Sequence, residues 1–323
     1  MLQSLPVTTL VFGVGYIGSR LVQELLYQAR DVVGVDNLFS TDRRAIEGFD
    51  QVPNFRFVEG SVVERSIVER ALDLAGDVES VFMLAAQASA NPAAASVEYT
   101  EEANLRAPRV ILEVLAERGM AGPVVYASST RVYGSPLPAE VTEETPFGVF
   151  VDYAHLSKCY VEKLLEMFSV THGLATRSVR LGLTYGVAPV MKTDPRFMTA
   201  PNLFCRRAAR GEPLDVRSAD PLGLIHVDDA VQALLITADA DEARYQVFNA
   251  APDVATVGEV AELVRMSATA REIEVTIRGS AILDRSVLRP VIRSKLNEIG
   301  FTPRRGLAHG ITETFDHFLV HGQ

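Results

Sequence analysis

Two residues with acid–base chemistry stand close together in the segment VDYAHLSKCYVEK, residues 151–163. Tyr153 and Lys158 are five positions apart, whereas side chains that meet on one face of an α-helix are three or four positions apart. At about 100° per residue, a separation of five turns two side chains about 140° away from each other. If the segment is helical, both residues reach one site only where the helix is irregular between them.

A second group of residues is typical of dinucleotide binding. The run VFGVGYIGS places Gly13, Gly15 and Gly18 between a predicted strand and a predicted helix. In this pattern the first glycine allows a tight turn, the second lets a pyrophosphate approach the backbone, and the third lets helix and strand pack closely. Asp36 ends the next predicted strand, where a carboxylate binds adenosine ribose hydroxyls and repels a 2′-phosphate. We therefore expect NAD rather than NADP.

The predicted elements alternate along the first half of the chain. Apolar runs predict strands at 7–12, 31–36, 55–60, 78–86, 122–129, 174–182 and 245–251, with helical patterns between most of them and over 227–238. Such alternation indicates βαβ units and a parallel sheet with helices on both faces. Pro108 lies inside one long helical pattern and predicts a kink or a new start there.

We therefore predict an α/β fold, a Rossmann-type doubly wound parallel sheet with a smaller, mixed α/β substrate-binding lobe. Residues 1–182 plus 226–249 are assigned to the NAD-binding domain, and 183–225 plus 250–323 to the lobe. The proline-containing segment 186–202 is predicted to be a loop or lid.

Composition narrows the classes of function. The chain has 323 residues and a net charge of −10, which argues against a nucleic-acid partner because phosphate backbones are bound by basic patches. No apolar run is long enough to cross a membrane, and the N-terminal segment lacks the basic start of a signal peptide. Cys159 and Cys205 have no metal-like spacing, so we expect free thiols, a cytoplasmic location and no metal site.

Several motifs together resemble the extended short-chain dehydrogenase/reductase family, the NAD-dependent nucleotide-sugar epimerases and dehydratases. They are VVYASSTRVYG, VFMLAAQAS, DNLFS, IHVDDA and the SK pair with its following Glu162, and the resemblance runs from about Leu10 to Asp229. It implies that Ser129 hydrogen-bonds the substrate oxygen, that Tyr153 is the acid or base, and that Lys158 lowers its pKa. The cofactor-binding residues that it implies are Gly13, Gly15, Tyr16, Ile17, Gly18, Asp36, Asn37, Ser61, Val62, Leu84, Ala85, Ala86 and Lys158.

The sequence departs from the family pattern at the tyrosine, which the family would place at Ala154. Three explanations stay open. A π-bulge or an irregular helix start absorbs the extra residue and returns Tyr153 to the site, which is the explanation we favour. Alternatively, His155 serves as the acid or base. In the third explanation the site is inactive and the protein only binds NAD.

Other departures concern the substrate. Thr130 and Arg131 stand where family dehydratases and decarboxylases carry an acid, so elimination and decarboxylation are not expected. Leu183 and Leu222 replace polar residues that help to bind a nucleoside diphosphate in the family. We expect a small-molecule, sugar-like substrate, either a sugar or a nucleotide sugar, with an anionic group left open. The expected reaction is epimerisation of a hydroxyl-bearing carbon through hydride transfer and a keto intermediate. A dehydrogenase or ketoreductase of a smaller substrate is the alternative.

The resemblance also implies a homodimer. The helical patterns near 95–118 and 153–170 would pair across a two-fold axis, and the run CYVEKLLEMF supplies an apolar stripe for this contact. The same stripe could instead be buried in the core.

Overall fold

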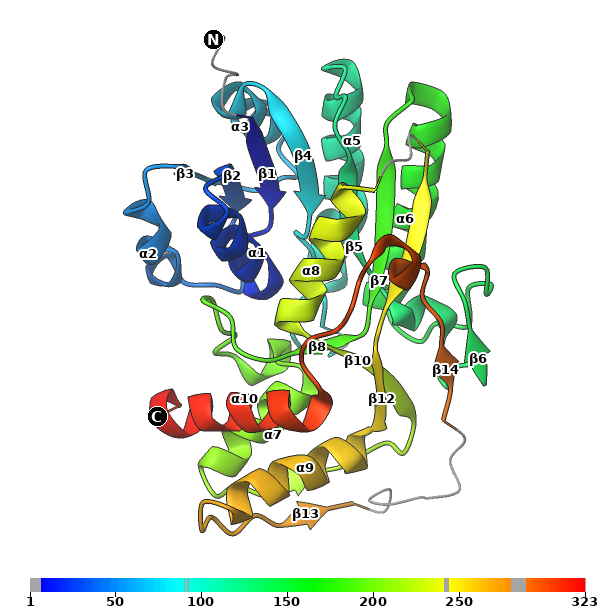
Figure 1. Ribbon diagram of the computed structural model, residues 1–323. Coiled ribbons are helices and arrows are strands. Elements are labelled where there is room, and N and C mark those ends of the chain that lie inside the picture. The colour runs from blue at the N-terminus through cyan, green and yellow to red at the C-terminus, as the bar shows by residue number, and fades with distance from the viewer. Residues whose placement is uncertain (1–6, 90, 92, 241–243, 280–288, 323) are drawn as a thin grey trace.

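The computed structural model describes residues 7–89, 91, 93–240, 244–279 and 289–322. Its main sheet has seven parallel strands in the order β11-β7-β5-β4-β1-β2-β3 (Figure 1). This arrangement confirms the predicted Rossmann-type doubly wound sheet. The strands are β1 (Thr8–Phe12), β2 (Asp31–Asp36), β3 (Phe55–Glu59), β4 (Val78–Met83), β5 (Val124–Ser129), β7 (Thr176–Leu181) and β11 (Gln246–Ala250).

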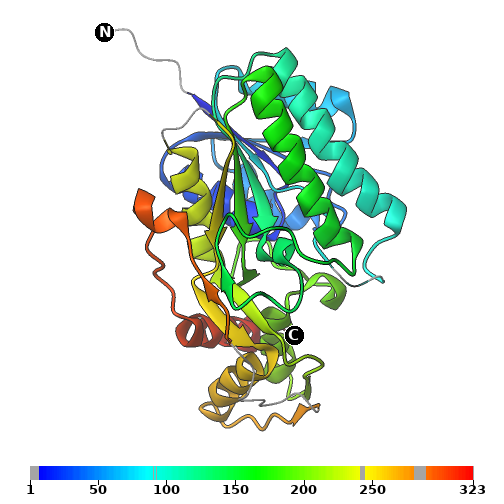
Figure 2. The same cartoon turned by 90° about the vertical axis from the view of Figure 1, so that its right-hand side faces the viewer.

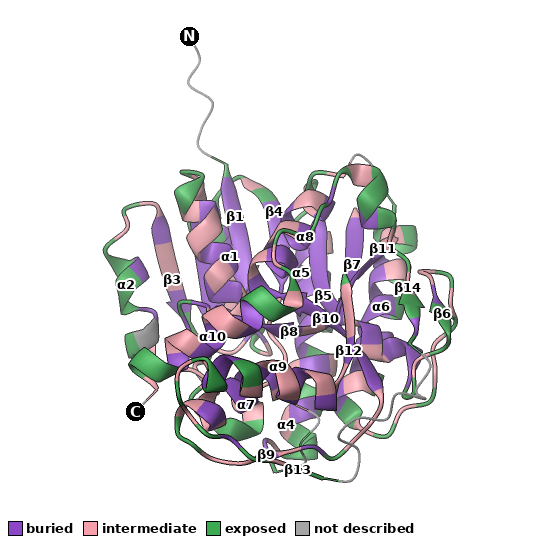
Figure 3. Cartoon of the chain, turned by 60° about the horizontal axis from the view of Figure 1, so that its bottom comes forward, coloured by how far each residue is buried: buried purple, intermediate pink, exposed green. Residues whose placement is uncertain are grey.

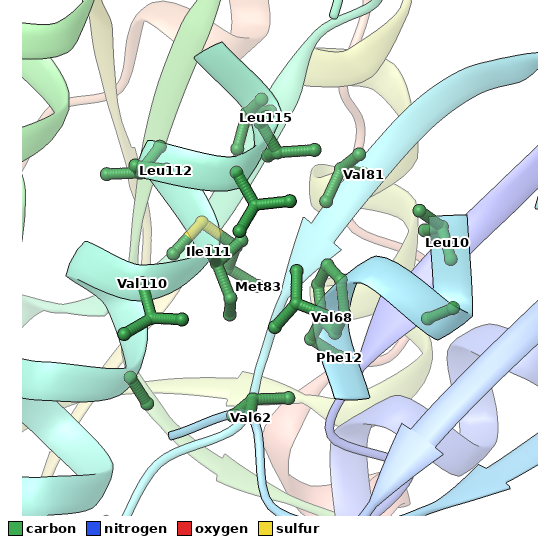
Figure 4. Packing of buried hydrophobic residues seen from close by; sticks show 14 of the residues in the cluster. Leu10, Phe12, Val62, Val68, Val81, Met83, Val110, Ile111, Leu112 and Leu115 are labelled. Carbon is green, nitrogen blue, oxygen red and sulfur yellow. The ribbon is translucent and has the colours of Figure 1, made fainter. Parts of the chain in front are cut away.

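Helices cover both faces of this sheet because side chains on each strand alternate between them. Leu10 and Phe12 pack toward one face, which carries α3 (Arg65–Ala75), α5 (Ala107–Glu117) and α6 (Tyr153–His172), as Figures 2 and 4 show. Val11 packs toward the other face, which carries α1 (Tyr16–Tyr27), α2 (Glu47–Asp50) and α8 (Val227–Ala238). The central strands β1, β5 and β7 are thus buried on both sides, as Figure 3 shows, whereas the edge strand β3 is only partly buried.

A smaller lobe lies below the carboxyl ends of the main strands in Figure 1. It contains a three-stranded sheet of order β12-β10-β8 and a two-stranded sheet of β13 and β9, and it has its own hydrophobic cluster. Its elements are β8 (Leu183–Tyr185), α7 (Ala200–Ala209), β9 (Leu214–Asp215), β10 (Pro221–His226), β12 (Asp253–Thr256), α9 (Val257–Thr269), β13 (Ile277–Arg278) and α10 (Leu307–His321).

The predicted domain boundaries stay a prediction, but one short segment packs across them. The 3-10 turn η5 (Lys295–Ile299) contacts α8 and β11, and Leu296 belongs to the hydrophobic cluster of the main sheet. Nearby, β14 (Val291–Ile292) pairs with β6 (Glu140–Val141). The remaining turns are η1 (Arg43–Ala45), η3 (Thr130–Tyr133) and η4 (Pro195–Phe197).

The long helix with the internal proline has a π turn. Its parts are α4 (Val97–Glu101), η2 (Glu102–Arg106) and α5, and the N–H of Ala107 donates to the carbonyl of Glu102, five residues back. Pro108 has no N–H to donate to the carbonyl four residues earlier, so the hydrogen-bond pattern of a regular helix cannot continue there. The predicted irregularity at Pro108 therefore takes the form of a π turn immediately before it.

An ion pair buried between α6 and β7 fixes the position of α6. Glu162 is 1% exposed and accepts hydrogen bonds from the Arg180 guanidinium at 2.7–3.2 Å and from the Ser128 hydroxyl at 2.5 Å. Arg180 also donates to the Tyr133 hydroxyl at 2.6 Å. These bonds satisfy both charges. They also fix the position of α6 along the direction of strands β5 and β7.

Breaking this pair should cost much more than breaking a surface pair. In Arg180→Met, Glu162 becomes an uncompensated buried charge, and we expect the free energy of unfolding to fall by about 3–5 kcal/mol in urea titrations. Arg109→Met removes an exposed helical pair with Glu113 and should cost less than about 1 kcal/mol. In Arg180→Met/Glu162→Gln much of the loss should return. Equal losses in Arg180→Met and Arg109→Met would contradict this assignment.

Candidate functional site

A cleft with a volume of about 550 Å³ lies at the carboxyl ends of the main strands and continues to the smaller lobe. It contains the point between β1 and β4 where the strand order reverses, which is where doubly wound sheets bind ligands. Ser129, Lys158 and every residue predicted to bind the cofactor line this cleft. Tyr153 does not line it. The structure thus brings the predicted site residues together with one exception.

The glycine-rich turn has the shape that a dinucleotide requires. Gly13 has a φ of +101°, and a Cβ there would lie 2.4 Å from the backbone nitrogen of Ala85. A Cβ on Gly18 would lie 1.8 Å from the carbonyl oxygen of Gly13. A Cβ on Gly15 would instead point into the cleft before the first turn of α1, where the nearest atom is Nζ of Lys192 at 3.6 Å. The turn therefore presents backbone amides at the N-terminus of α1, the kind of site at which a pyrophosphate binds.

The carboxylate at the end of β2 is held rigidly beside this turn. Asp36 accepts hydrogen bonds from the backbone N–H of Val14 and of Leu38, each at 2.8 Å. Burial raises the pKa of its carboxyl group, while these hydrogen bonds act in the opposite direction. Asn37 follows and donates to the Tyr99 hydroxyl at 3.3 Å. This geometry fits ribose hydroxyls, as expected for NAD.

The remaining cofactor-side residues come from the ends of β3 and β4. Ser61 and Val62 follow β3 and line the cleft, as do residues 84–86 after β4. The predicted strand at 78–86 ends at Met83, because the N–H groups of Leu84 and Ala85 both turn to the carbonyl of Phe12. These bonds hold the loop against the glycine-rich turn.

Lys158 is buried at the floor of the cleft. Its Nζ donates to the carbonyl of Ala127 at 2.9 Å and lies 4.7 Å from the centre of the Tyr126 ring. Burial lowers the pKa of Lys158 to about 8, and the charge of Glu162 opposes this shift. Glu162 is neutralised by Arg180, so the lysine has no ion-pair partner among the described residues and retains donors for a ligand.

The expectation that a π-bulge returns Tyr153 to the site is wrong. Asp152 caps α6 by accepting from the N–H of His155 at 2.9 Å, and the helix runs as an α-helix from Tyr153. A regular helix turns Tyr153 about 140° from Lys158. Tyr153 is 54% exposed and lines a separate surface groove with Leu156. The π turn occurs instead on the neighbouring helix, at η2.

His155 and Ala154 take the places next to Lys158 in the cleft. Three and four positions before the lysine, they share its helix face. The Nδ1 of His155 lies 2.6 Å from Oδ2 of Asp152. Burial raises the pKa of Asp152, but hydrogen bonds from the His155 ring and backbone outweigh it, so the pKa lies below its usual value. Asp152 is therefore a carboxylate near neutral pH, and it holds the His155 ring from the Nδ1 side.

Asn104 connects the π turn to the site. Its amide oxygen accepts from the N–H of Gln87 at 2.7 Å, and its amide nitrogen donates to the Gln87 carbonyl at 2.8 Å and to the Ser157 hydroxyl at 2.9 Å. It is 2% exposed. Asn104 thus joins the loop after β4 to the start of α6, two segments that line the cleft together with Ser129.

The substrate side of the cleft carries two leucines at positions that are polar in the family pattern. They are Leu183 and Leu222, and both line the cleft. Arg131 also lines it, and burial lowers the pKa of its guanidinium against the opposing charges of Asp220 and Asp152. The lining of the cleft does not include Arg180, Arg196, Arg217 or Arg289.

Sequence reasoning missed two contributions to the cofactor side of the cleft. The rings of Phe39 and Tyr99 stack with centroids 3.8 Å apart, and both line the cleft. Lys192 lines it as well and donates to the Ser40 hydroxyl at 2.5 Å. Lys192 lies in the segment predicted to be a loop or lid, so the segment was recognised but its only lysine was not. No local pattern links it to the glycine-rich turn.

Comparison with known proteins agrees with this geometry. The sequence model of the NAD dependent epimerase/dehydratase family matches residues 9–251. The chain is 25% identical over 320 residues to the low-salt glycan biosynthesis protein Agl12 of Haloferax volcanii, covering 95% of this chain and 96% of that protein. It is 25% identical over 326 residues to a UDP-glucose 4-epimerase of Mycolicibacterium smegmatis, covering 96% and 98%.

Solved structures show the same fold. A UDP-glucose 4-epimerase of Thermotoga maritima, crystallised with UDP-glucose, superposes with a TM-score of 0.82 at 24% identity and covers 98% of this chain and 100% of that one. A Thermus thermophilus UDP-glucose 4-epimerase in complex with NAD gives a TM-score of 0.81 at 24% identity, with coverages of 97% and 99%. The family match, the glycine-rich turn and the cleft lead to one conclusion: the chain belongs to the NAD-dependent epimerase/dehydratase family, enzymes of the extended short-chain dehydrogenase/reductase type whose cofactor is NAD.

Proposed function

We propose that this enzyme epimerises a carbinol centre of a sugar or nucleotide sugar. The observation that carries the proposal is the continuous cleft in which the dinucleotide turn, Ser129, Lys158 and His155 all lie. Bound NAD would supply a hydride acceptor that later returns the hydride. The protein's own groups would bind the hydroxyl and move its proton, which the keto intermediate needs at both stages.

His155, held by Asp152, is proposed as the group that takes this proton. Ser129 would hydrogen-bond the substrate oxygen, and Nε2 of His155 would accept the proton as the alcohol is oxidised. Asp152 would stabilise the imidazolium that forms, since Nδ1 lies 2.6 Å from its carboxylate. The proton would return by the same route when the ketone is reduced. Tyr153 has no place in this scheme because it lies on the other side of α6.

The substrate proposed first is a nucleotide sugar. The relatives and the solved structures named above are mainly enzymes of UDP-sugars, and they match over nearly the whole chain. Leu183 and Leu222 favour the alternative, a smaller substrate without a nucleoside diphosphate, because neither can donate to phosphate. In either case Arg131 offers a cation to an anionic substituent of the substrate.

We further propose a homodimer formed through α6. Its outer face exposes Tyr153, Leu156, Tyr160 and Met167 at 42–54%, at spacings of three, four and seven that form one stripe. Tyr153, Leu156 and Tyr160 of this stripe line a groove of about 460 Å³ that reaches α4 and η2. A long apolar stripe on an exposed helix is the kind of surface that a two-fold partner buries.

A cytoplasmic location is proposed from the thiols. Cys159 and Cys205 are both buried and free, as is usual in a reducing compartment. Burial raises the pKa of the Cys159 thiol to about 12, so it is protonated and unreactive near neutral pH. Among the described residues, no helix is long and apolar enough to span a membrane.

Two variants test the proposed function and its acid–base group. The wild-type enzyme, incubated with UDP-sugars, should produce the epimer in chromatography without a net change in NADH absorbance. His155→Gln should lower kcat by about 10²–10⁴-fold, and Tyr153→Phe should change it by less than about threefold. If only Tyr153→Phe loses activity, the histidine assignment is overturned. If the wild type consumes NAD stoichiometrically, the dehydrogenase alternative replaces epimerisation.

The buried lysine predicts a pH dependence of stability. The pKa of Lys158 is about 8 in the folded state against 10.5 for a free lysine. Between these values the unfolded state binds more protons, so the free energy of unfolding should rise with pH, by about 3 kcal/mol in total. Lys158→Met should abolish this rise in urea titrations of the cofactor-free protein. A rise of the same size in the variant would show that other groups cause it.

Charge on the α6 stripe should prevent association. Leu156→Glu places a carboxylate in the proposed contact, and sedimentation velocity should show a monomer where the wild type is a dimer. Tyr27→Glu, on the exposed side of α1, is the matched control and should remain dimeric. A dimer in both variants would place the interface elsewhere.

A further inference from the structure

The segment that follows β8 crosses from the smaller lobe to the cofactor side of the cleft and is fastened there. The Tyr16 hydroxyl donates to the carbonyl of Gly186 at 2.7 Å, and the N–H of Val190 donates to the Ser19 hydroxyl at 3.1 Å. Both partners lie in the first turns of α1, the helix that starts at the glycine-rich turn. Val190 is 1% exposed. The backbone on the N-terminal side of Lys192 is therefore held against the dinucleotide site.

These anchors place the ammonium of Lys192 above the glycine-rich turn. Its Nζ lies 3.6 Å from where a Cβ of Gly15 would stand and donates to the Ser40 hydroxyl at 2.5 Å. The charge of Asp36 acts on it from nearby, yet no carboxylate of the described residues forms an ion pair with it. Among the described residues, Lys192 is thus a partly buried cation whose hydrogen-bond partner, the Ser40 hydroxyl, is neutral.

This arrangement is unfavourable until an anion binds. The N-terminus of α1 carries the positive end of the helix dipole, and the ammonium lies beside it. Burial lowers the pKa of Lys192, which reflects the incomplete compensation of its charge. A diphosphate between the amides of α1 and the ammonium would satisfy both at once.

We propose that Lys192 is a cofactor-binding residue that closes the loop of the smaller lobe over the pyrophosphate of NAD. The lysine supplies a charge-assisted hydrogen bond from the side of the cleft opposite the glycine-rich turn. Because the loop continues through η4 to α7 of the smaller lobe, cofactor binding and the position of that lobe are coupled. The proposal concerns binding, so it stands or falls independently of the reaction proposed above.

Calorimetric titration of the cofactor-stripped protein tests this role. Lys192→Gln should weaken NAD⁺ and ADP-ribose by about ten- to a hundredfold, while adenosine, which has no phosphate, should bind within about twofold of wild type. Lys192→Arg should retain most of the affinity. Lys295→Gln, which removes an exposed lysine paired with Glu144, is the matched control and should leave all three affinities unchanged.

The contrary outcomes are distinct. Equal weakening of adenosine and ADP-ribose would show that Lys192 shapes the adenosine pocket, and it would overturn the pyrophosphate assignment. A selective loss of NADP⁺ with NAD⁺ unaffected would place the ammonium at the ribose 2′ position instead. Thermal unfolding without cofactor separates folding from binding: Lys192→Gln should unfold at or above the wild-type temperature, because it removes an unpaired charge. A large fall in the unfolding temperature, together with weaker binding of every ligand, would show that Lys192 has a structural role instead.

Discussion

The site depends on one buried carboxylate. Glu162 is held by Arg180 and by Ser128, and a charge buried this deeply cannot slide along the sheet without losing its partners. The pair therefore fixes both the position of α6 along the sheet and the rotation of α6 about its own axis. Once Glu162 faces the sheet, Lys158, four residues earlier on the same helix face, must enter the cleft.

The same constraint decides the position of the tyrosine. With α6 regular from its first residue, the helix geometry that directs Lys158 inward directs Tyr153 outward, and it brings Ala154 and His155 to the cleft. Accommodating a π turn in α6 would require rotating its first turn away from the Asp152 cap and from the Asn104–Ser157 bond. The adjacent helix, interrupted by Pro108, already contains the π turn. Pro108 thus accounts for the irregular helix, while the Asp152 cap and the Asn104–Ser157 bond keep α6 regular.

The two lobes meet over the cofactor, and they do so through hydrogen bonds from a loop. Tyr16, Ser19 and Ser40 on the dinucleotide side bind residues 186–192 of the other lobe. Asn202 of α7 extends this network by accepting from the N–H of Gly186 at 3.0 Å and donating to the Tyr16 hydroxyl at 3.2 Å. The floor of the site is thus built from strand ends of the main sheet, while its cover belongs to the lobe in which Leu183 and Leu222 depart from the family pattern.

The sequence by itself determined the parts that are local. Alternating apolar runs specified the parallel sheet, and the glycine spacing with Asp36 specified the dinucleotide turn, because each depends on neighbouring residues and on strand and helix periodicity. The 140° separation of Tyr153 from Lys158 was also present in the spacing. Only the tertiary structure decided that α6 is regular and therefore preserves this separation. The rotation of the helix is set by Arg180, which lies eighteen residues beyond Glu162 in the sequence. Lys192 likewise gained its place through bonds to Ser40, 152 residues away, which no local pattern encodes.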